Sequence, residues 1–598
     1  MADHKRGWKQ FQKLTFDSKK FSKRVKKAEG ATTRHARRFI VSRLDNIRSV
    51  RRHIIGWLLV VGVIMALVGL QLVWFQRSYQ TTAASSGGTY AEASLGSIET
   101  LNPLYASSSA EVAASHLLFS SLYDYDGTGH LRGDLAERIQ IDATGTLYTV
   151  TLRSNALWHD GTHLTAKDVA FTVNLIKNPA TRSALRSTWQ DISVKALNDT
   201  TVQFQLPAIY ASFQHALTFA VLPQHLLGNV DPGAIRENVF SRSPVGSGPF
   251  SFRLIQTTDT VTKQQVLNLT AFNDYYKGAP LINRFEIHAY DSQEAILKAL
   301  RTGQVNAAAD LNGANAAQVD HHNYNVTTRP INSGVYALLN VTSPILKDKT
   351  VRQALQLGTN TSEIRQSLVV KVPSLDLPFV NGQLTGSDVP HAPAPDRAKA
   401  AALLDSAGWK LVNGVRIKDG QKLTLNVVTT KNTEYEKALE IMIGQWRQLG
   451  ILVMTNVVDT NNPATNFAQD IQQPRNYDVY LTELSIGADP DVYAYWHSSQ
   501  ISMNGYNFSN YADKAADSAL ASARSRLEPD LRNVKYIAFA KQWLADVPAI
   551  GLYQPVAEYV SNKSVRSVKQ NETLITPYGR YENVLYWSVA QKSVYKTP

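Results

Sequence analysis

The stretch 152-LRSNALWHDGTHLTAKDVAFTV-173 is the most informative part of the sequence for the fold. It places His159, Asp160 and His163 within five residues, and the two histidines are spaced as a metal-binding helix requires. The dipeptide Asp160-Gly161 between them is instead a turn signal. We therefore interpret these residues as a turn, with a metal site and a catalytic centre as the alternatives.

The elements on either side of this turn follow from residue patterns. Alternating apolar residues at 147–152 and at 201–206 indicate strands with one buried face. Thr165, followed three residues later by Asp168, is typical of a helix N-cap with an acidic first turn. Further helices are predicted at 396–407, 434–449 and 531–544, and Gly408 and Gly450 end the first two. The chain beyond about residue 90 is therefore predicted to be mixed α/β.

Length and composition limit the possible classes of protein. The 598 residues exceed the ~250–300 at which a single core stops growing, so at least two lobes are expected. The chain has no cysteine, which excludes disulfides, thiolate nucleophiles and cysteine-ligated metals. It also has no Gly-x-Ser-x-Gly, His-Glu-x-x-His or phosphate-loop motif, so the sequence does not predict an enzyme.

The net charge of +13 lies entirely in the first 53 residues, which contain 17 Lys and Arg against 4 Asp and Glu. The next 22 residues, Ile54–Phe75, have Gln71 as their only strongly polar side chain. That length crosses the ~30 Å hydrocarbon layer as a helix. Trp57 and Trp74 lie near its ends, where indoles favour the interface. Because the basic residues precede this helix, the N-terminus is predicted to be cytoplasmic and the chain beyond it exported.

The segments beside this helix have several interpretations. The basic arm 1–53 is interpreted as a topology determinant that contacts anionic lipid. A nucleic-acid-binding tail and a contact with a membrane partner are its alternatives. Residues 76–90 are rich in small side chains and are predicted to be a flexible linker. Signal-peptidase cleavage near Ala84 is the alternative to an uncleaved anchor.

The stretch 152–173 resembles the signature of the extracellular solute-binding proteins of family 5, the peptide-binding and related receptors of ABC importers. Eight further motifs fall in the order of that family: Leu101–Pro103, Leu122-Tyr123, Gly133–Glu137, Val245–Phe250, Phe272–Pro280, Val351–Leu355, Ala400–Trp409 and Asp546–Tyr553. Each motif is weakly specific, but their order is strong support. The resemblance covers roughly residues 90–598.

The resemblance implies an α/β, two-lobe periplasmic-binding-protein-like fold of type II with an extra subdomain, preceded by one transmembrane helix. Lobe 1 would span 91–340, with the inserted subdomain at about 122–225. Lobe 2 would span 341–555, and residues 556–598 would return to lobe 1. The lobes are expected to close on a ligand by hinge motion.

The resemblance also implies a ligand site. In peptide-binding members, a strand after a Tyr-Asp motif, here Tyr477-Asp478, pairs with the peptide backbone, which accepts many side chains. An ungapped reading puts Gly487 where those members have the aspartate that holds the peptide ammonium. Asp489 and Glu483 are the substitute carboxylates. The candidate ligand-binding residues are Ser107, Ser108, Ser109, Glu483, Ser485, Gly487 and Asp489.

The sequence therefore predicts a membrane-anchored extracytoplasmic solute-binding protein that captures peptides or peptide-like solutes for an ABC importer. Since no cysteine is available for lipidation, the helix at 54–75 would hold it at the membrane. Its expected partners are the solute, the importer's membrane subunits and the membrane, with no cofactor, metal or nucleic acid. A receptor or adhesion module without transport and a membrane-anchored hydrolase are the alternatives.

Overall fold

A computed structural model describes residues 22–23, 26–27, 30, 34, 47–259, 264–460, 462, 465–568 and 574–595. The chain divides into two compact units, residues 1–83 with 592–598, and residues 84–591. Most of the predicted basic arm lies outside the described residues.

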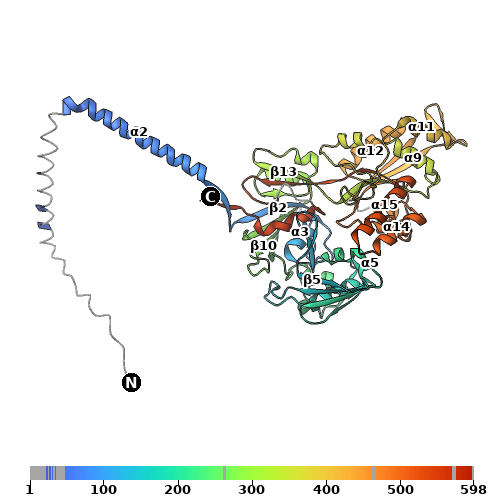
Figure 1. The fold of residues 1–598 in the computed structure, drawn as a ribbon, viewed down its shortest axis with the longest axis horizontal. Helices are drawn as coiled ribbons and strands as arrows, with labels where there is room; N and C mark the ends of the chain where they lie inside the picture. The colour runs from blue at the N-terminus through green and yellow to red at the C-terminus, as the bar shows by residue number, and fades with distance from the viewer. Residues whose placement is uncertain are drawn as a thin grey trace, which may run out of the picture. The chain divides into compact units, whose positions relative to one another are not determined.

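The smaller unit contains helix α2 (Ile47–Tyr79), which strand β1 (Gln80–Ser85) follows; β1 pairs with β23 (Ala590–Tyr595). Helix α2 is labelled in Figure 1. Within it, His53–Phe75 is the one span among the described residues that is long and apolar enough to cross a membrane. The predicted linker 76–90 thus holds the end of α2, β1 and the start of the next strand.

The first lobe of the larger unit is built on a mixed sheet in the order β13-β22-β12-β2-β11-β10-β9. Strand β2 is buried on both faces and pairs in parallel with β11 and β12. The strands are β2 (Thr89–Leu95), β9 (Phe250–Asp259), β10 (Gln264–Ala271), β11 (Arg284–Tyr290), β12 (Ala307–Ala308), β13 (Tyr324–Pro330) and β22 (Val556–Asn562). Helices α3 (Ser109–Leu118) and α7 (Gln293–Arg301) each pack in a separate hydrophobic cluster against this sheet.

A subdomain formed by Tyr123–Thr218 is inserted into this lobe (teal in Figure 1). Its larger sheet has the order β5-β6-β8-β7, and β3 pairs with β4. The elements are β3 (Tyr123–Tyr125), β4 (Leu131–Gly133), β5 (Ala136–Ile141), β6 (Leu147–Leu152), α4 (Ala166–Lys177), β7 (Ser193–Ala196), β8 (Thr201–Gln205) and the 3₁₀ helix η3 (Ala211–Thr218). The strands predicted at 147–152 and 201–206 and the helix predicted from Thr165 are confirmed.

The stretch that opened the sequence analysis forms the turn between β6 and α4. Thr165 caps α4, and its backbone amide donates to Asp168 at 2.8 Å, as the capping-box pattern requires. The His159 ring is partly buried; its Nδ1 accepts from Gly246 N at 3.1 Å, and its Nε2 bonds Gly248 O at 3.0 Å. Burial lowers the pKa of His159 to about 4. The described residues contain no group of three or more His, Asp or Glu arranged to hold a metal ion.

The second lobe is built on a sheet in the order β19-β18-β20-β14-β21. Its strands are β14 (Ser333–Leu339), β18 (Thr424–Thr430), β19 (Leu452–Val458), β20 (Val479–Ser485) and β21 (Ala549–Tyr553). Helices α9 (Lys349–Leu357), α11 (Arg397–Ser406) and α12 (Thr433–Arg447) pack in one hydrophobic cluster, and α14 (Lys514–Arg524) and α15 (Pro529–Asp546) pack in another. The helices predicted at 396–407, 434–449 and 531–544 are confirmed, and Gly408 and Gly450 end two of them with positive φ.

Two short connections join the lobes. The chain passes from β13 to β14 through residues 331–332 and returns from β21 to β22 through residues 554–555. The amide of Ile331 donates to Pro555 O at 3.1 Å, and the side chain of Gln554 donates to Ile331 O at 3.0 Å. Since both connections are short and hydrogen-bonded to each other, they form a paired hinge about which the lobes can rotate.

Candidate functional site

A cavity of about 880 Å³ lies between the lobes. It lies within the range of sites for small ligands. Lobe 1 lines it with Ser109, residues 309–312 and residues 555–559, and lobe 2 lines it with residues 431–436 and Glu483. Because both lobes supply walls, rotation about the hinge would open or close this cavity.

Strand β20 presents a free backbone edge in lobe 2. Strand β14 pairs with the whole of β20 on one side. On the other side β18 pairs with Val479–Leu481 and ends at Thr430. Among the described residues, Thr482–Ser485 therefore have one edge with no partner strand. Such an edge can accept an extended peptide by main-chain hydrogen bonds.

The cavity wall is acidic. Eight acidic and three basic residues line it; Lys431 pairs with Asp459 at 2.9 Å, Arg580 pairs with Glu92 at 2.7 Å, and Arg329 is also engaged. Glu92 is itself fully buried and also accepts from the hydroxyls of Tyr559 and Tyr581. The field of the unpaired carboxylates favours a cationic ligand group.

Three carboxyl groups in the cavity wall have raised pKa values. Burial raises the pKa of Glu434, Glu483 and Glu558, and Glu434 is raised further by the charge of Glu483. Glu483 accepts from Tyr435 Oη at 3.3 Å, and Glu558 accepts from Thr328 Oγ1 at 3.2 Å. No salt bridge neutralises these three groups within the described residues, so each would be stabilised by a cation.

The serines predicted to face the ligand are only partly at the cavity. Ser108 caps α3, and the side chain of Glu111 accepts from the backbone amides of Ser107 at 2.8 Å and Ser108 at 3.1 Å. Only Ser109 among the three lines the cavity. The backbone amides of Ser107 and Ser108 are therefore occupied by the capping box and are not available to a ligand. The site prediction did not include Glu111, which occupies them.

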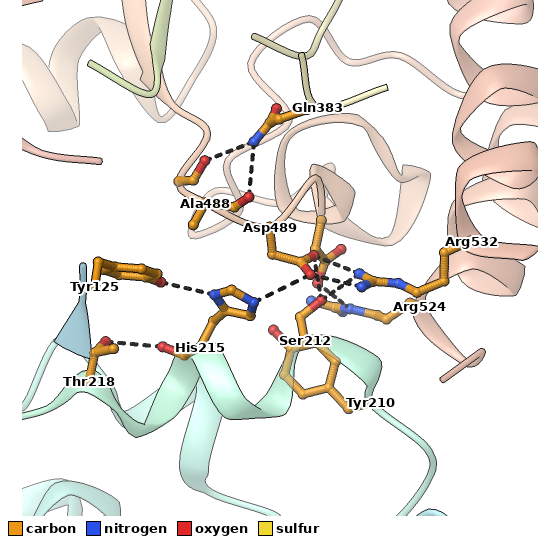
Figure 2. A network of polar contacts seen from close by, with 12 residues as sticks. Tyr125, Tyr210, Ser212, His215, Thr218, Gln383, Ala488, Asp489, Arg524 and Arg532 are labelled. Atoms are coloured by element: carbon orange, nitrogen blue, oxygen red, sulfur yellow. Dashed lines mark hydrogen bonds and ion pairs between the residues drawn. The ribbon is translucent and has the colours of Figure 1, made fainter. Parts of the chain in front are cut away.

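Asp489, predicted as a substitute for the ammonium-binding aspartate, does not line the cavity and already has a cationic partner. Arg532 on α15 donates to it twice, at 2.8 Å from Nη1 and 2.6 Å from Nη2 (Figure 2). Burial opposes ionisation, but the hydrogen bonds and charge of Arg532 hold the pKa of Asp489 below its usual value. With its charge matched, Asp489 has no need of a ligand ammonium.

The Asp489–Arg532 pair also joins the subdomain to lobe 2. Ser212 on η3 donates to Asp489 at 2.7 Å, and Nε2 of His215 lies 3.6 Å from the same carboxylate (Figure 2). Arg524 on α14 lies over the ring of Tyr210, 4.7 Å from its centroid. These contacts join the subdomain to lobe 2, so they would break if the two moved apart.

Gly487 and Ser485 lie where β20 leaves the sheet toward the hinge. The amide of Gly487 donates to Asn332 O at 2.9 Å, and its carbonyl accepts from Asn332 Nδ2 at 3.1 Å and Gln383 Nε2 at 2.8 Å. Its φ of +80° is a conformation that glycine adopts without strain. Ser485 is exposed, and its carbonyl accepts from Tyr495 at 2.6 Å. Gly487 is thus held by the hinge, beside the free edge of β20.

Two α/β lobes, a paired hinge and an acidic cavity between them define a two-lobed solute-binding protein. The chain belongs to the bacterial extracellular solute-binding proteins of family 5, whose middle region matches residues 130–505. Members of this family bind solutes and are not enzymes. The predicted family and the predicted two-lobe fold are confirmed.

The comparisons cover most of the chain. The oligopeptide-binding protein AppA of Bacillus subtilis is 29% identical over 491 residues, 78% of this chain and 86% of the relative. A solved structure of that protein with a nonapeptide has a TM-score of 0.69 at 27% identity, and covers 85% of this chain and 100% of the other. The structure of NikZ from Campylobacter jejuni with Ni(L-His) has a TM-score of 0.71 at 25% identity. The match covers 84% of this chain and 99% of NikZ.

Proposed function

We propose that this protein captures peptides or peptide-like solutes outside the cytoplasm and delivers them to an ABC importer. The free edge of β20 at Thr482–Ser485, beside Glu483 in an acidic cavity, is the observation that carries the proposal. Main-chain pairing at this edge would hold a peptide whatever its side chains are. The similarity to a protein named for oligopeptide binding supports the same ligand class.

We assign the peptide ammonium to Glu483. Its carboxyl group lines the cavity on the strand that carries the free edge, and it is hydrogen-bonded to Tyr435 and Ser333 with no salt bridge among the described residues. A buried ammonium without a counter-charge is costly, so a carboxylate has to face it when the lobes close. Asp489, which is paired with Arg532, is unsuited to this role.

Delivery to an importer rests on closure of the lobes. The ligand would stabilise the closed arrangement because it contacts both walls of the cavity, and the importer would recognise that arrangement. The contacts of Ser212 and Asp489 would form at the same time. The importer's membrane subunits are therefore the proposed protein partner, as the similarity to peptide-binding proteins of ABC transporters suggests.

We further propose that α2 anchors the binding domain with the N-terminus in the cytoplasm. The apolar span His53–Phe75 is long enough to cross the bilayer, and the basic residues precede it. The proposed parts are the basic arm 1–53, the anchor 54–75, a linker 76–90, lobe 1 at 91–340, lobe 2 at 341–555 and the return at 556–598. Cleavage near Ala84 would instead release the domain.

Mass spectrometry of the detergent-purified full chain tests the ligand class. Under native conditions we expect a bound mass that denaturation releases and that fragments as a peptide. If denaturation releases no ligand, the protein is mixed with synthetic peptides, and binding of these peptides would support the same conclusion. Release of a sugar or a metal chelate, with no binding of any peptide, would contradict the proposal.

A further inference from the structure

A second cavity, of about 350 Å³, lies in lobe 1 between α3, the β3–β4 hairpin and the 3₁₀ helix η8 (Pro577–Tyr586). We call it the aromatic pocket, because Phe119, Tyr125, Tyr275, Tyr578 and Tyr581 line it. Its volume is at the lower end of the range for ligand sites. It therefore has room for a small group and not for a whole oligopeptide.

Two carboxylates of the aromatic pocket, Asp124 and Asp126, have no salt bridge among the described residues. Asp134 binds Lys277 and accepts from Tyr276 at 2.6 Å, and Glu582 binds Arg132 at 2.7 Å. Asp124 accepts only the amide of its neighbour Tyr125, at 2.8 Å, among the described residues. Asp126 accepts three hydrogen bonds at its Oδ1, so Asp124 is the carboxylate of the pocket whose charge is left without stabilising partners.

Electrostatic surroundings agree with this assignment. Burial, with the nearby charge of Asp134, raises the pKa of Asp124 to about 6, although Lys277 and Arg132 oppose the shift. Burial lowers the pKa of His116, which also lines the pocket, to about 4, so its ring is neutral near pH 7. A carboxylate among aromatic rings is suited to an ammonium or guanidinium group, which gains both an ion pair and cation–π contacts.

The aromatic pocket and the interlobe cavity share two walls. Ser109 lines the interlobe cavity, and Val112 and His116, three and seven residues further along α3, line the aromatic pocket. On η8, Pro577 and Arg580 line the first, and Tyr578 and Tyr581 the second. A side chain of a ligand in the interlobe cavity that passes between α3 and η8 would reach the aromatic pocket.

We propose that the aromatic pocket binds a cationic side chain, lysine or arginine, of a peptide held in the interlobe cavity, with Asp124 as its counter-charge. This inference rests on the proposed function and adds a preference for one class of peptide. A main-chain site accepts every sequence, whereas an unmatched carboxylate rewards only peptides with a positive charge at the position that reaches it.

Calorimetric titration of the full chain in detergent with paired pentapeptides tests the proposal. Each pair carries lysine or the uncharged norleucine at one position of an alanine peptide, and the position is moved along the chain. At one position we expect lysine to bind about tenfold or more tightly than norleucine, the effect of one charge-assisted hydrogen bond. Asp124→Asn should abolish the difference.

Asp126→Asn is the matched control. Asp126 lies two residues away on the same pocket wall, but Oδ1 of Asp126 already accepts from Thr128 N and Oγ1 and from His130 N. This variant should keep the lysine preference. Equal loss in both variants would mean a general effect of charge and would overturn the assignment to Asp124.

The native protein supplies a second measurement that does not depend on a variant. Asp124 faces Asp134, Arg132, Lys277, Glu582 and the neutral His116. Because its pKa is raised to about 6, its carboxylate is present above that pH and is lost as the pH falls. The preference for lysine over norleucine should therefore shrink between pH 7.5 and pH 5. A preference that is constant over this range would contradict the proposal.

Two further outcomes separate this inference from the proposed function. If lysine and norleucine peptides bind equally at every position, the inference fails and peptide capture stands. If no peptide binds, the proposal of peptide capture fails, and titration with pentylamine then tests whether the aromatic pocket binds an ammonium group. Pentylamine binding that Asp124→Asn abolishes would show an ammonium site for a free amine, and the absence of such binding would overturn the site altogether.

Discussion

Asp489→Asn should destabilise the fold and leave ammonium recognition intact. Arg532 makes two charge-assisted hydrogen bonds to Asp489, and its side chain is only 13% exposed. Breaking a buried ion pair by removing one partner costs ~3–5 kcal/mol. Asparagine keeps one acceptor, and Arg532 keeps Ser212 and Tyr536 as neighbours, so we expect a smaller loss, ~2–3 kcal/mol.

A double-mutant cycle measured by urea denaturation isolates the pair. Asp489→Asn, Arg532→Met and the double variant should give a coupling energy of ~2 kcal/mol, because the second substitution removes the charge that the first leaves unpaired. N-acetylation of a peptide ligand should weaken its binding to Asp489→Asn as much as to the native protein. Additive losses of stability, or an acetylation effect that vanishes in Asp489→Asn, would refute this reasoning.

Four other predictions follow from particular residues. Because partial burial lowers the folded pKa of His159 to about 4, the unfolded chain binds more protons below pH ~6.5. Stability should therefore fall from there toward pH 4, and His159→Gln should flatten the urea-midpoint profile. His159→Ala with His163→Ala should leave ligand affinity within about threefold, and loss of a stoichiometric zinc in elemental analysis would contradict the turn interpretation. Gly313→Leu should weaken ligand binding about tenfold and leave the melting temperature unchanged. A Cβ at this position would lie 1.9 Å from Val370 of lobe 2 and would therefore resist closure of the lobes. Unchanged affinity in a titration would contradict this prediction. Protease added outside intact cells should remove residues beyond 90 and spare 1–53, whereas protection of the large part would reverse the proposed topology.

Individual turns, helices and strands could be predicted from local signals, whereas the two-lobe arrangement was implied by the family resemblance. The Asp160-Gly161 turn and the Thr165 cap are short-range features, and the structure has both where the sequence indicates them. The helical spacing of apolar residues and the glycine after the last turn likewise identified the helices that end near Gly408 and Gly450. Such features depend on residues that are close in sequence, so a single sequence is enough to predict them.

The binding site was less predictable because it depends on contacts distant in sequence. Asp489 reads as a free carboxylate until Arg532, 43 residues further on, is brought beside it. Glu434 reads as an acidic residue in the first turn of a helix, and only the tertiary structure places it in the cavity wall. Asp124 has no motif at all. Glu483 was found because it lies on a strand whose place the family resemblance supplied.

Binding of one peptide in two chemical forms tests the central claim most directly. A peptide recovered from the purified protein would be titrated with a free and with an acetylated N-terminus against the native chain and Glu483→Gln. We predict that acetylation and Glu483→Gln each weaken binding by ~2–5 kcal/mol, and that acetylation has little further effect on the variant. Equal binding of both peptide forms by the native protein, or an undiminished acetylation effect in Glu483→Gln, would contradict the account.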